Sequence, residues 1–482
     1  MHWDVTLILL PLAGAMLAFL FPRVGGRLGL LTAFSVLFAA IALAAALIGE
    51  GVQRHLVGGW PAPLGITLST DGLSMTMLLT AAVVGLGISL YAAVWFRQEP
   101  LNGERFWPLW LLLWGALNAL FLSADLFNLY VTLELLGLSA VGLAAVAGGG
   151  AAYAAAMRYL LVSLIGSLLY LLGVALIYHA CGSVDIALVA ARLSPSAASG
   201  AALALMVTGL LLKSALFPLH FWLPAAHANA GAPVSAALSG LVVKATFYLL
   251  LRLWLELFDT FAPQLETLLG LLGAAAVLWG SLQALRQSRL KLLIAYSTVA
   301  QIGYLFMAFP LAAAAGLQAW YGALYLVMSH ALAKSAMFLA AGNLRRHAGH
   351  DRIAELDLVA QRLPLSVSAF ALAGMTIMGL PPSGGFIAKW WLLQAALVQG
   401  MWWWALVLVA GGLMSAAYLF KVVGFAFTRA RGPHEACPVP LSMEWIALLL
   451  AVGSVLLGLL VLPPMALLGV GDPFGLALGA GR

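Results

Sequence analysis

The chain has 482 residues, of which 64% are hydrophobic and 8% are charged, and its formal net charge is +6. Soluble proteins carry about 25% charged residues, so this composition excludes a soluble enzyme. Apolar runs of about 20 residues recur from end to end, and each can cross a hydrocarbon core of roughly 30 Å. These runs are continuous rather than alternating, which excludes an outer-membrane β-barrel. We therefore predict an all-α polytopic membrane protein.

The hydropathy pattern predicts about fourteen transmembrane helices in one integral membrane domain, 1–482. The first apolar run lacks the basic segment and the small-residue cleavage site of a signal peptide, so we expect it to be a retained span. The longest polar stretch, 345–362, is expected to be a surface loop. The predicted spans cover 3–22, 28–48, 72–96, 107–123, 125–147, 157–180, 200–222, 234–258, 265–284, 290–310, 316–343, 364–398, 402–428 and 443–463.

Basic residues fall mainly in alternate loops, and this bias predicts the orientation of the chain. Fourteen of the 23 Lys and Arg residues, Lys291 among them, are assigned to one side, and four, Arg252 among them, to the other. Cytoplasmic loops are enriched in Lys and Arg, so we expect the richer side to face the cytoplasm of a cell inner membrane. Both termini would then face the opposite side. The positive net charge reports topology and gives no support for nucleic-acid binding.

Five lysines are predicted to lie within spans, where Lys is rare because it costs about 2.5–3.5 kcal/mol at the centre of a helix. They are Lys213, Lys244, Lys334, Lys389 and Lys421. Lys421 is close to a span end, so its ammonium group could reach the membrane interface along its flexible stem. The other four are deeper. Each of them belongs either to a structural ion pair or to an ion pathway.

Glu134 is the one carboxylate that the pattern places centrally in a span. Asp71 and Asp125 begin spans, where an acid favours the positive end of the helix dipole, so we expect both to be caps. A buried Glu beside a buried Lys changes the proton affinity of both groups, and such a pair can relay protons in a dry interior. The residue pattern alone does not bring Glu134 and Lys213 together.

Three histidines add to these candidates. His330 and Lys334 are four residues apart and share a helix face, which favours a relay. His220 and His227 flank a proline-rich segment. The alternative is that each histidine is a structural group with satisfied hydrogen bonds.

Two spans are predicted to be broken, at Pro218 and at Pro381, in the segments KSALFPLHFWLP and GLPPSGGFIAK. Proline removes a helical hydrogen bond, and broken helices at membrane depth are found at ion and substrate sites. A packing kink is the alternative. The seventh and twelfth spans are five apart, which suggests two inverted five-helix repeats, 107–258 and 265–428, between N-terminal helices in 1–96 and a last helix, 443–463. Lys213 would then match Lys389, and Lys244 would match Lys421.

The cysteines and glycines argue against a bound cofactor. Cys181 and Cys437 are far apart, and neither lies in a CxxC or CxxCH motif, so iron–sulfur, zinc and c-type haem sites are not expected. Walker and GxGxxG nucleotide motifs are absent. We expect no cofactor and no metal.

Five segments resemble a known family: FNLYVTLELLGLSA, KSALFPLHFWLPAAHANAGAPVSAALSGLVVKATFYLLLR, RLKLLIAYSTVAQIGY, SHALAKSAMFLAAGNL and GLPPSGGFIAKWWLL. They are similar to the antiporter-like subunits of respiratory complex I, of Mrp-type Na⁺/H⁺ antiporters and of energy-converting hydrogenases. The resemblance covers roughly 70–427 and implies fourteen helices with two inverted repeats, spans 4–8 and 9–13, in which helices 7 and 12 are broken. The N-terminal region looks most like the Mrp antiporter component of type D, whereas AAHANAGAPVSA is closer to the complex I and hydrogenase relatives.

The resemblance also implies roles for individual residues. Lys213 would be the partner of Glu134, and water would reach it through the break at Pro218. The implied proton relay comprises Glu134, Lys213, Lys244, His330, Lys334 and Lys389.

These observations leave more than one function open. The leading hypothesis is a proton-translocating subunit of a multisubunit Na⁺/H⁺ antiporter, which works with other membrane subunits in the lipid bilayer. The alternative is a proton-pumping membrane subunit of a complex I-like NADH/quinone oxidoreductase or of a hydrogenase, in which electrons pass through other chains. A quinone-binding enzyme in its own right and a packing scaffold with structural charges are two further readings.

Overall fold

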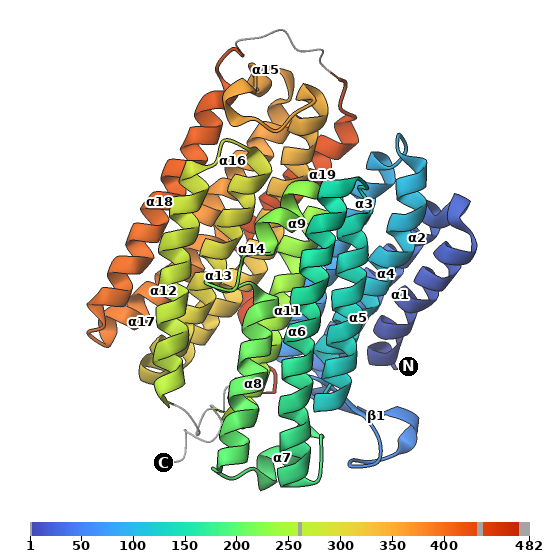
Figure 1. The fold of residues 1–482 in the computed structure, drawn as a ribbon, viewed down its shortest axis with the longest axis vertical. Helices are drawn as coiled ribbons and strands as arrows, with labels where there is room; N and C mark the ends of the chain where they lie inside the picture. Colours follow the sequence, from blue (N-terminus) through green and yellow to red (C-terminus); the bar gives the residue numbers. More distant parts are fainter. Residues whose placement is uncertain (1, 259–262, 431–436, 472–482) are drawn as a thin grey trace.

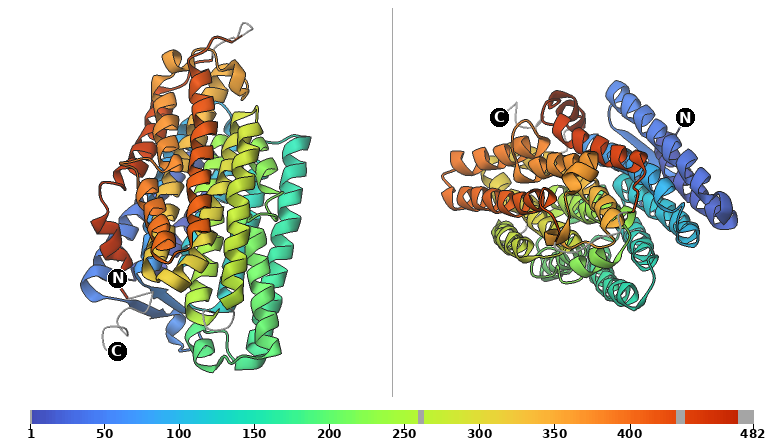
Figure 2. Two further views of the ribbon diagram at one scale, coloured as in Figure 1. Left: turned by 90° about the vertical axis from the view of Figure 1, so that its left-hand side faces the viewer. Right: turned by 90° about the horizontal axis from the view of Figure 1, so that it is seen from above.

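The computed structural model describes residues 2–258, 263–430 and 437–471, and these form a bundle of long helices side by side (Figure 1, Figure 2). Within this part of the chain, twelve helices are long and apolar enough to cross a membrane. The broken pair α16 (Pro364–Met378) and α17 (Gly384–Val398) and the shorter apolar α19 (Leu441–Leu456) account for the remaining two predicted spans. The all-α membrane fold is therefore confirmed.

Three N-terminal helices, α1 (Trp3–Leu20), α2 (Gly25–Glu50) and α3 (Gly72–Trp95), match the predicted spans closely. A short antiparallel hairpin, which was not predicted, separates α2 from α3. Its strands are β1 (Gln53–Leu56) and β2 (Thr67–Thr70). We call the end of the bundle that carries this hairpin and α7 (Ile186–Arg192) the hairpin end, and the end that carries α15 (Val359–Arg362) the basic end (Figure 1).

The first predicted repeat begins with α4, which starts seven residues before its predicted span. The first broken helix is the main departure from prediction. α8 ends at Ser214, because Ala215 takes a left-handed conformation and Pro218 offers no N–H, and the chain becomes helical again only at Leu223. The elements are α4 (Pro100–Leu122), α5 (Leu126–Ala145), α6 (Gly150–Cys181), α7 (Ile186–Arg192), α8 (Ala197–Ser214), α9 (Leu223–Asn229), α10 (Ala232–Ala237) and α11 (Val243–Leu253).

The second predicted repeat contains the break at Pro381. α16 ends at Met378, and its C-cap residue Gly379 has a φ of 82° that glycine adopts without strain. Ser383 caps the start of α17 by accepting a hydrogen bond from the Phe386 N–H. The remaining elements are α12 (Pro263–Arg286), α13 (Leu290–Ala315), α14 (Leu317–Ala348), α15 (Val359–Arg362), α18 (Trp402–Ala426) and α20 (Leu462–Leu468).

Three spans form the centre of the bundle. The most apolar window of 232–258 is 100% buried, that of α14 is 94% buried and that of α13 is 89% buried, against 33% for α1 and for α18. α14 packs against α13, α16, α17 and α19. The outer helices therefore present apolar side chains to lipid, whereas polar groups on the inner helices contact only protein.

Two acids cap helices as predicted. Asp71 precedes α3, and its carboxylate accepts a hydrogen bond from the Ser74 N–H at 2.8 Å. Asp125 precedes α5 and accepts a hydrogen bond from the Asn128 N–H at 2.7 Å. Each cap satisfies a backbone donor that the first turn of a helix leaves free.

Candidate functional site

The break after α8 holds Lys213 against two other helices. Its Nζ lies 3.7 Å from Oε1 of Glu134 on α5 and 2.9 Å from Oγ of Ser163 on α6. Lys213 is 6% exposed, so solvent does not replace these partners. Gly137 leaves the room that the ammonium group occupies, because a Cβ there would lie 2.5 Å from Ser163 Oγ and 3.3 Å from Lys213 Nζ. The structure thus brings together the pair that the residue pattern left unconnected.

A small cavity lies beside this pair and extends toward α11. Lys213, Ser163, Val242 and Thr246 are among its lining residues. The space open to the centre of a water molecule is ≈ 10 Å³, which is enough for about one water. Thr246 is two residues after Lys244 on α11, and residues two apart on a helix face different directions. The cavity therefore lies beside Lys213 and does not reach Lys244.

Lys244 is 1% exposed and follows a π-helical turn, Leu238–Val242. Such turns are frequent at functional sites because they free a backbone carbonyl from the regular ladder. Here Lys244 Nζ donates to the Ser239 carbonyl. The Ser239 hydroxyl lies 2.8 Å from the Thr298 hydroxyl of α13. The π-turn thereby connects Lys244 to α13.

Lys334 on α14 meets the same helix from the other side. It is fully buried, and its Nζ donates to the Ile294 carbonyl at 3.1 Å and to the Ser297 hydroxyl. Thr298 also donates to the Ile294 carbonyl, at 3.1 Å. The Ile294 carbonyl thus accepts hydrogen bonds from Lys334 and from Thr298, whose hydroxyl contacts that of Ser239. His330 lies one turn earlier on α14, and its Nε2 is buried without a hydrogen-bond partner among the described residues.

Lys389 lies in the first two turns of α17, across the second break. Its Nζ donates to the Ile377 carbonyl at 2.7 Å, at the end of α16, and lies 4.3 Å from the ring centroid of Tyr304. Gln301 Nε2 donates to the same Ile377 carbonyl at 3.3 Å. A cation over an aromatic face and a shared carbonyl together hold the ammonium group without a carboxylate.

A tyrosine closes the chain of contacts between the two lysines of the second half. The Tyr418 side chain of α18 is close to those of Ser297 and Gln301, and its hydroxyl donates to Ser415 at 3.1 Å. Ser297 binds Lys334, and Gln301 shares its carbonyl with Lys389. Polar side chains therefore line the interval between Lys334 and Lys389, and hydrogen bonds hold the lysine at each end.

These bridging residues come from one face of α13, and the sequence analysis missed them. Residues 294, 297, 298, 301 and 304 follow the three- and four-residue spacing of a helix face. The span contains no acid, so it gave no charge signal. The spacing of Ser297, Gln301 and Tyr304 within an apolar helix was the signal available.

Lys291 was assigned to a loop, and that assignment is wrong. It is the second residue of α13 and is 1% exposed, and its Nζ donates to the Ala230 carbonyl between α9 and α10. His227, also fully buried, stacks on Phe338 with ring centroids 4.6 Å apart. The charges of Lys291, Lys334 and Lys244 all act on its ring. His227 is therefore close enough to Lys291 and to the central lysines for their charges to act on it.

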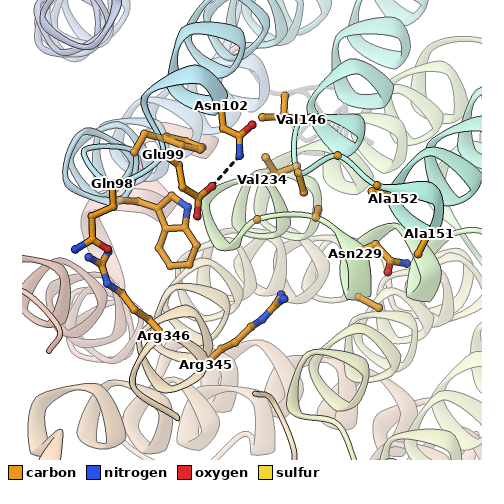
Figure 3. A pocket seen from close by; sticks show the side chains of 18 of the residues that line it. Gln98, Glu99, Asn102, Val146, Ala151, Ala152, Asn229, Val234, Arg345 and Arg346 are labelled. Carbon is orange, nitrogen blue, oxygen red and sulfur yellow. Dashed lines mark hydrogen bonds between the residues drawn. The ribbon is translucent and has the colours of Figure 1, made fainter. Parts of the chain in front are cut away.

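A cavity of about 600 Å³ opens at the basic end next to Lys291 (Figure 3). Glu99 and Asn102 of the α4 region line one part of it, and Arg345 and Arg346 extend from α14 on another. Ala230, whose carbonyl binds Lys291, lines the cavity too. A water-sized path from the basic end therefore reaches the wall behind which Lys291 and His227 are buried.

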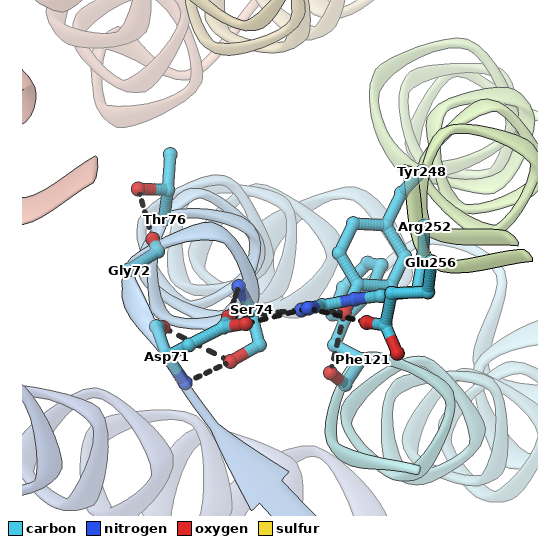
Figure 4. A network of polar contacts seen from close by, with 8 residues as sticks. All are labelled: Asp71, Gly72, Ser74, Thr76, Phe121, Tyr248, Arg252 and Glu256. Carbon is cyan, nitrogen blue, oxygen red and sulfur yellow. Dashed lines mark hydrogen bonds and ion pairs between the residues drawn. The ribbon is translucent and has the colours of Figure 1, made fainter. Parts of the chain in front are cut away.

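A second polar network lies at the hairpin end (Figure 4). Arg252 lies on α11, within the predicted span 234–258, and forms a bidentate ion pair with Asp71, with one contact of 2.9 Å from Nη2 to Oδ1. Arg252 also binds Tyr248 at 3.0 Å and Glu256 at 3.1 Å. Burial opposes ionisation of Asp71, but the Arg252 charge and the hydrogen bonds from Arg252 and Ser74 outweigh it and lower the pKa of the Asp71 carboxyl.

Lys421 and His220 occupy less central positions. Lys421 is half-buried near the end of α18, and its Nζ donates to the carbonyls of Leu285 at 3.0 Å and Gln287 at 2.8 Å, at the end of α12. Lys421 thus caps a neighbouring helix. His220 lies in the non-helical break, where its ring stacks on Phe217 with centroids 5.5 Å apart.

The proposed match between the two broken helices is only approximate. Lys213 lies before its break, one residue from the end of α8, whereas Lys389 lies after its break, within α17. The two-repeat division and the roles of the site residues stay predictions.

The matched family profile covers residues 123–415 and describes the membrane part of NADH:quinone oxidoreductase and Mrp antiporter subunits. The chain belongs to this family. The N-type component of the NADH-quinone oxidoreductase of Desulforudis audaxviator is 36% identical over 95% of this chain and 96% of its own length. The D-type component of the Na⁺/H⁺ antiporter of Alkalihalophilus pseudofirmus is 27% identical over 87% of this chain and 86% of its own length.

Solved structures of multisubunit membrane complexes contain similar chains. The similar chain in the Mrp complex of Dietzia sp. gives a TM-score of 0.87 at 27% identity, and the match covers 98% of both chains. The one in respiratory complex I of Thermus thermophilus gives a TM-score of 0.78 at 25% identity and covers 97% of this chain and 99% of that chain. This antiporter-like protein therefore has the fold common to both kinds of complex.

Proposed function

We propose that this proton-translocating, antiporter-like subunit moves protons along a buried line that comprises Glu134, Lys213, Lys244, His330, Lys334 and Lys389. The observation that carries the proposal is the polar face of α13, which is linked to Lys244 through Ser239, binds Lys334 through Ser297 and shares a carbonyl with Lys389 through Gln301. Hydroxyls, an amide and shared carbonyls fill each interval. These groups can exchange hydrogen-bond partners, which lets a proton move without opening a continuous water channel.

Electrostatic repulsion between the lysines would couple proton binding at one lysine to proton release from the next. Lys244, Lys334 and Lys389 lie in one dry interior, and none forms an ion pair with a carboxylate among the described residues. Like charges interact strongly at low dielectric, so a proton that arrives at one lysine favours proton release from its neighbour. The looser pair of Lys213 and Glu134 would set the charge at the start of the line.

The cavity at the basic end supports a direction for proton uptake. Water in it would reach the wall at Ala230, and Lys291 and His227 would carry the proton inward to Lys244. The basic end would face the cytoplasm, as its Arg and Lys content favours, and the hairpin end would face the opposite side.

A line of buried lysines does not favour Na⁺ as the transported ion. Hard cations require several oxygen ligands, whereas buried ammonium groups repel them. If the complete assembly exchanges Na⁺ for H⁺, the Na⁺ path would lie in another membrane subunit.

Two assemblies fit this chain, and the 36% identity to a complex I subunit gives the redox-driven one a specific basis. Purification of the chain from its native membrane in mild detergent, followed by identification of its partners, separates them. Partner subunits without redox centres, and proton flux that needs Na⁺, would support the antiporter. Iron–sulfur or nickel–iron subunits, and flux that needs an electron donor, would support the redox pump. A purified assembly that moves no protons under either condition would contradict the proposed function.

A further inference from the structure

Three potential metal ligands gather at the hairpin end, away from the proposed proton line. His2 is the cap residue of α1, Asp4 is in the first turn of α1, and His55 is in β1. One ligand atom from each lies within 4.8 Å of the other two. The two imidazole rings are tilted by 59°, with centroids 4.4 Å apart. The chain therefore brings two nitrogen ligands and one carboxylate to a single point.

Asp4 lacks a partner of its own. It is 6% exposed, and within the described part of the chain it forms no hydrogen bond and no ion pair. Its place in the first turn of α1 favours a negative charge, but the helix dipole contributes only about 0.3–1 kcal/mol at an exposed site. Its carboxylate oxygens are not among the buried side-chain atoms that lack a partner, so solvent or an ion can reach them. Asp4 therefore offers an accessible carboxylate that no protein donor occupies.

We propose that His2, Asp4 and His55 form a binding site for one divalent transition-metal ion of the zinc class. Imidazole nitrogen favours such ions over Mg²⁺ and Ca²⁺, which prefer oxygen ligands. Three protein ligands leave a fourth tetrahedral position for water. Bonds of about 2.0–2.2 Å put ligand atoms roughly 3.4 Å apart, so the group must contract slightly. The exposed His2 side chain is free to rotate inward.

The site would fasten the hairpin to the first transmembrane helix. His55 is held in register opposite Leu68 of β2, and Leu68 also forms a β-bridge with Ser123 after α4. A metal bound at His55 and Asp4 would therefore join α1 to an element that already contacts the first repeat. Because the folded state alone assembles the three ligands, binding would stabilise it.

The test uses the complete complex, purified without a polyhistidine tag and stripped with a chelator. Zn²⁺ is titrated against a competing zinc-binding dye, and retained metal is counted by mass spectrometry after dialysis. We expect one Zn²⁺ per chain and a rise in melting temperature with Zn²⁺ but not with Mg²⁺. Asp4→Asn and His55→Gln should each weaken binding at least tenfold and abolish the rise. His179→Gln, which alters an exposed histidine at the end of α6, should change neither.

Two results would overturn the proposal. One is an absence of retained Zn²⁺ in the wild-type complex, and the other is unchanged Zn²⁺ affinity in the variants, which would show adventitious binding. If Asp4→Asn does not assemble, His2→Gln decides the question, because His2 is exposed at the start of α1 and its loss leaves the packing intact. None of these readouts depends on proton flux, so a failure of the metal site and a failure of the proposed proton line remain distinguishable.

Discussion

The ammonium group of Lys213 lies 3.7 Å from the carboxylate of Glu134, which is beyond ordinary hydrogen-bond range. The Ser163 hydroxyl, at 2.9 Å, is the closer partner. The ion pair is therefore loose, and a shift of less than one ångström would close it. The Glu134 side chain is 19% exposed and that of Lys213 is 5% exposed, so the two charges are unequally solvated. Such a pair can change its charge state with small movements.

A substitution at Gln301 tests whether the polar face of α13 connects Lys334 to Lys389. Gln301→Leu removes the amide that shares the Ile377 carbonyl with Lys389, while the volume stays similar. A hydrogen bond near a charged group contributes about 1.5–3 kcal/mol, so we expect proton flux in reconstituted complexes to fall at least tenfold. Gln318→Leu is the matched control, because it breaks a 2.8 Å glutamine pair with Gln394 outside the line. Equal flux in both variants would argue against a bridge at Gln301.

Lys291 tests the uptake route. Lys291→Gln keeps a donor for the Ala230 carbonyl but removes the titratable group, so we expect lower proton flux with an unchanged melting temperature. Arg105→Gln, at an exposed position near the start of α4, removes a positive charge from the same end and should leave the flux as it is. Normal flux in Lys291→Gln would place the uptake path elsewhere.

Lys421 should matter for stability and not for transport. Lys421→Ala removes two hydrogen bonds to the last carbonyls of α12, and we expect a loss of about 1–2 kcal/mol in stability, seen as a lower melting temperature. Flux per assembled complex should change little. A complete loss of flux would show that Lys421 belongs to the relay after all.

The ion pair of Asp71 and Arg252 predicts a dependence of stability on acid. The folded-state pKa of Asp71 is lowered, so the pair contributes fully above the ordinary carboxyl pKa of about 3.9, and its contribution is lost as the pH falls through the folded value. Asp71→Asn should therefore lower the melting temperature at neutral pH, by a loss on the order of 3 kcal/mol. The difference in melting temperature between wild type and variant should become smaller below about pH 4. A difference in melting temperature that does not change with pH would contradict this account.

The sequence predicted the spans, the breaks and most of the buried charges for a physical reason. A helix that spans the hydrocarbon core requires a long apolar run. A Lys or Glu within such a run is easily recognised in the sequence, as Lys244 and Glu134 are. The prolines at 218 and 381 indicate helix breaks because proline has no backbone N–H to donate to the helical hydrogen bonds. The exact helix ends differed, most clearly where α8 stops at Ser214, and the hairpin of β1 and β2 was not predicted.

The same reasoning could not predict the uncharged residues that contact the buried lysines. Ser163 and Lys213 are 50 residues apart, and Gln301 and Ile377 are 76 apart, so only the fold brings them together. Serine and glutamine are common enough in membrane helices to carry no signal alone. Lys291 was misread because its neighbour Arg289 belongs to a basic loop, although the side chain of Lys291 points into the bundle.

The most direct test of the central claim is proton flux in proteoliposomes that contain the fully assembled complex, measured with an internal pH-sensitive dye. Glu134→Gln and Lys213→Ala are compared with Glu50→Gln, an exposed acid at the end of α2. We expect the first two variants to assemble and to lose most of their flux, because no solvent replaces the missing partner, whereas the third should match wild type. Wild-type flux in assembled Glu134→Gln and Lys213→Ala complexes would contradict a proton path along the buried line.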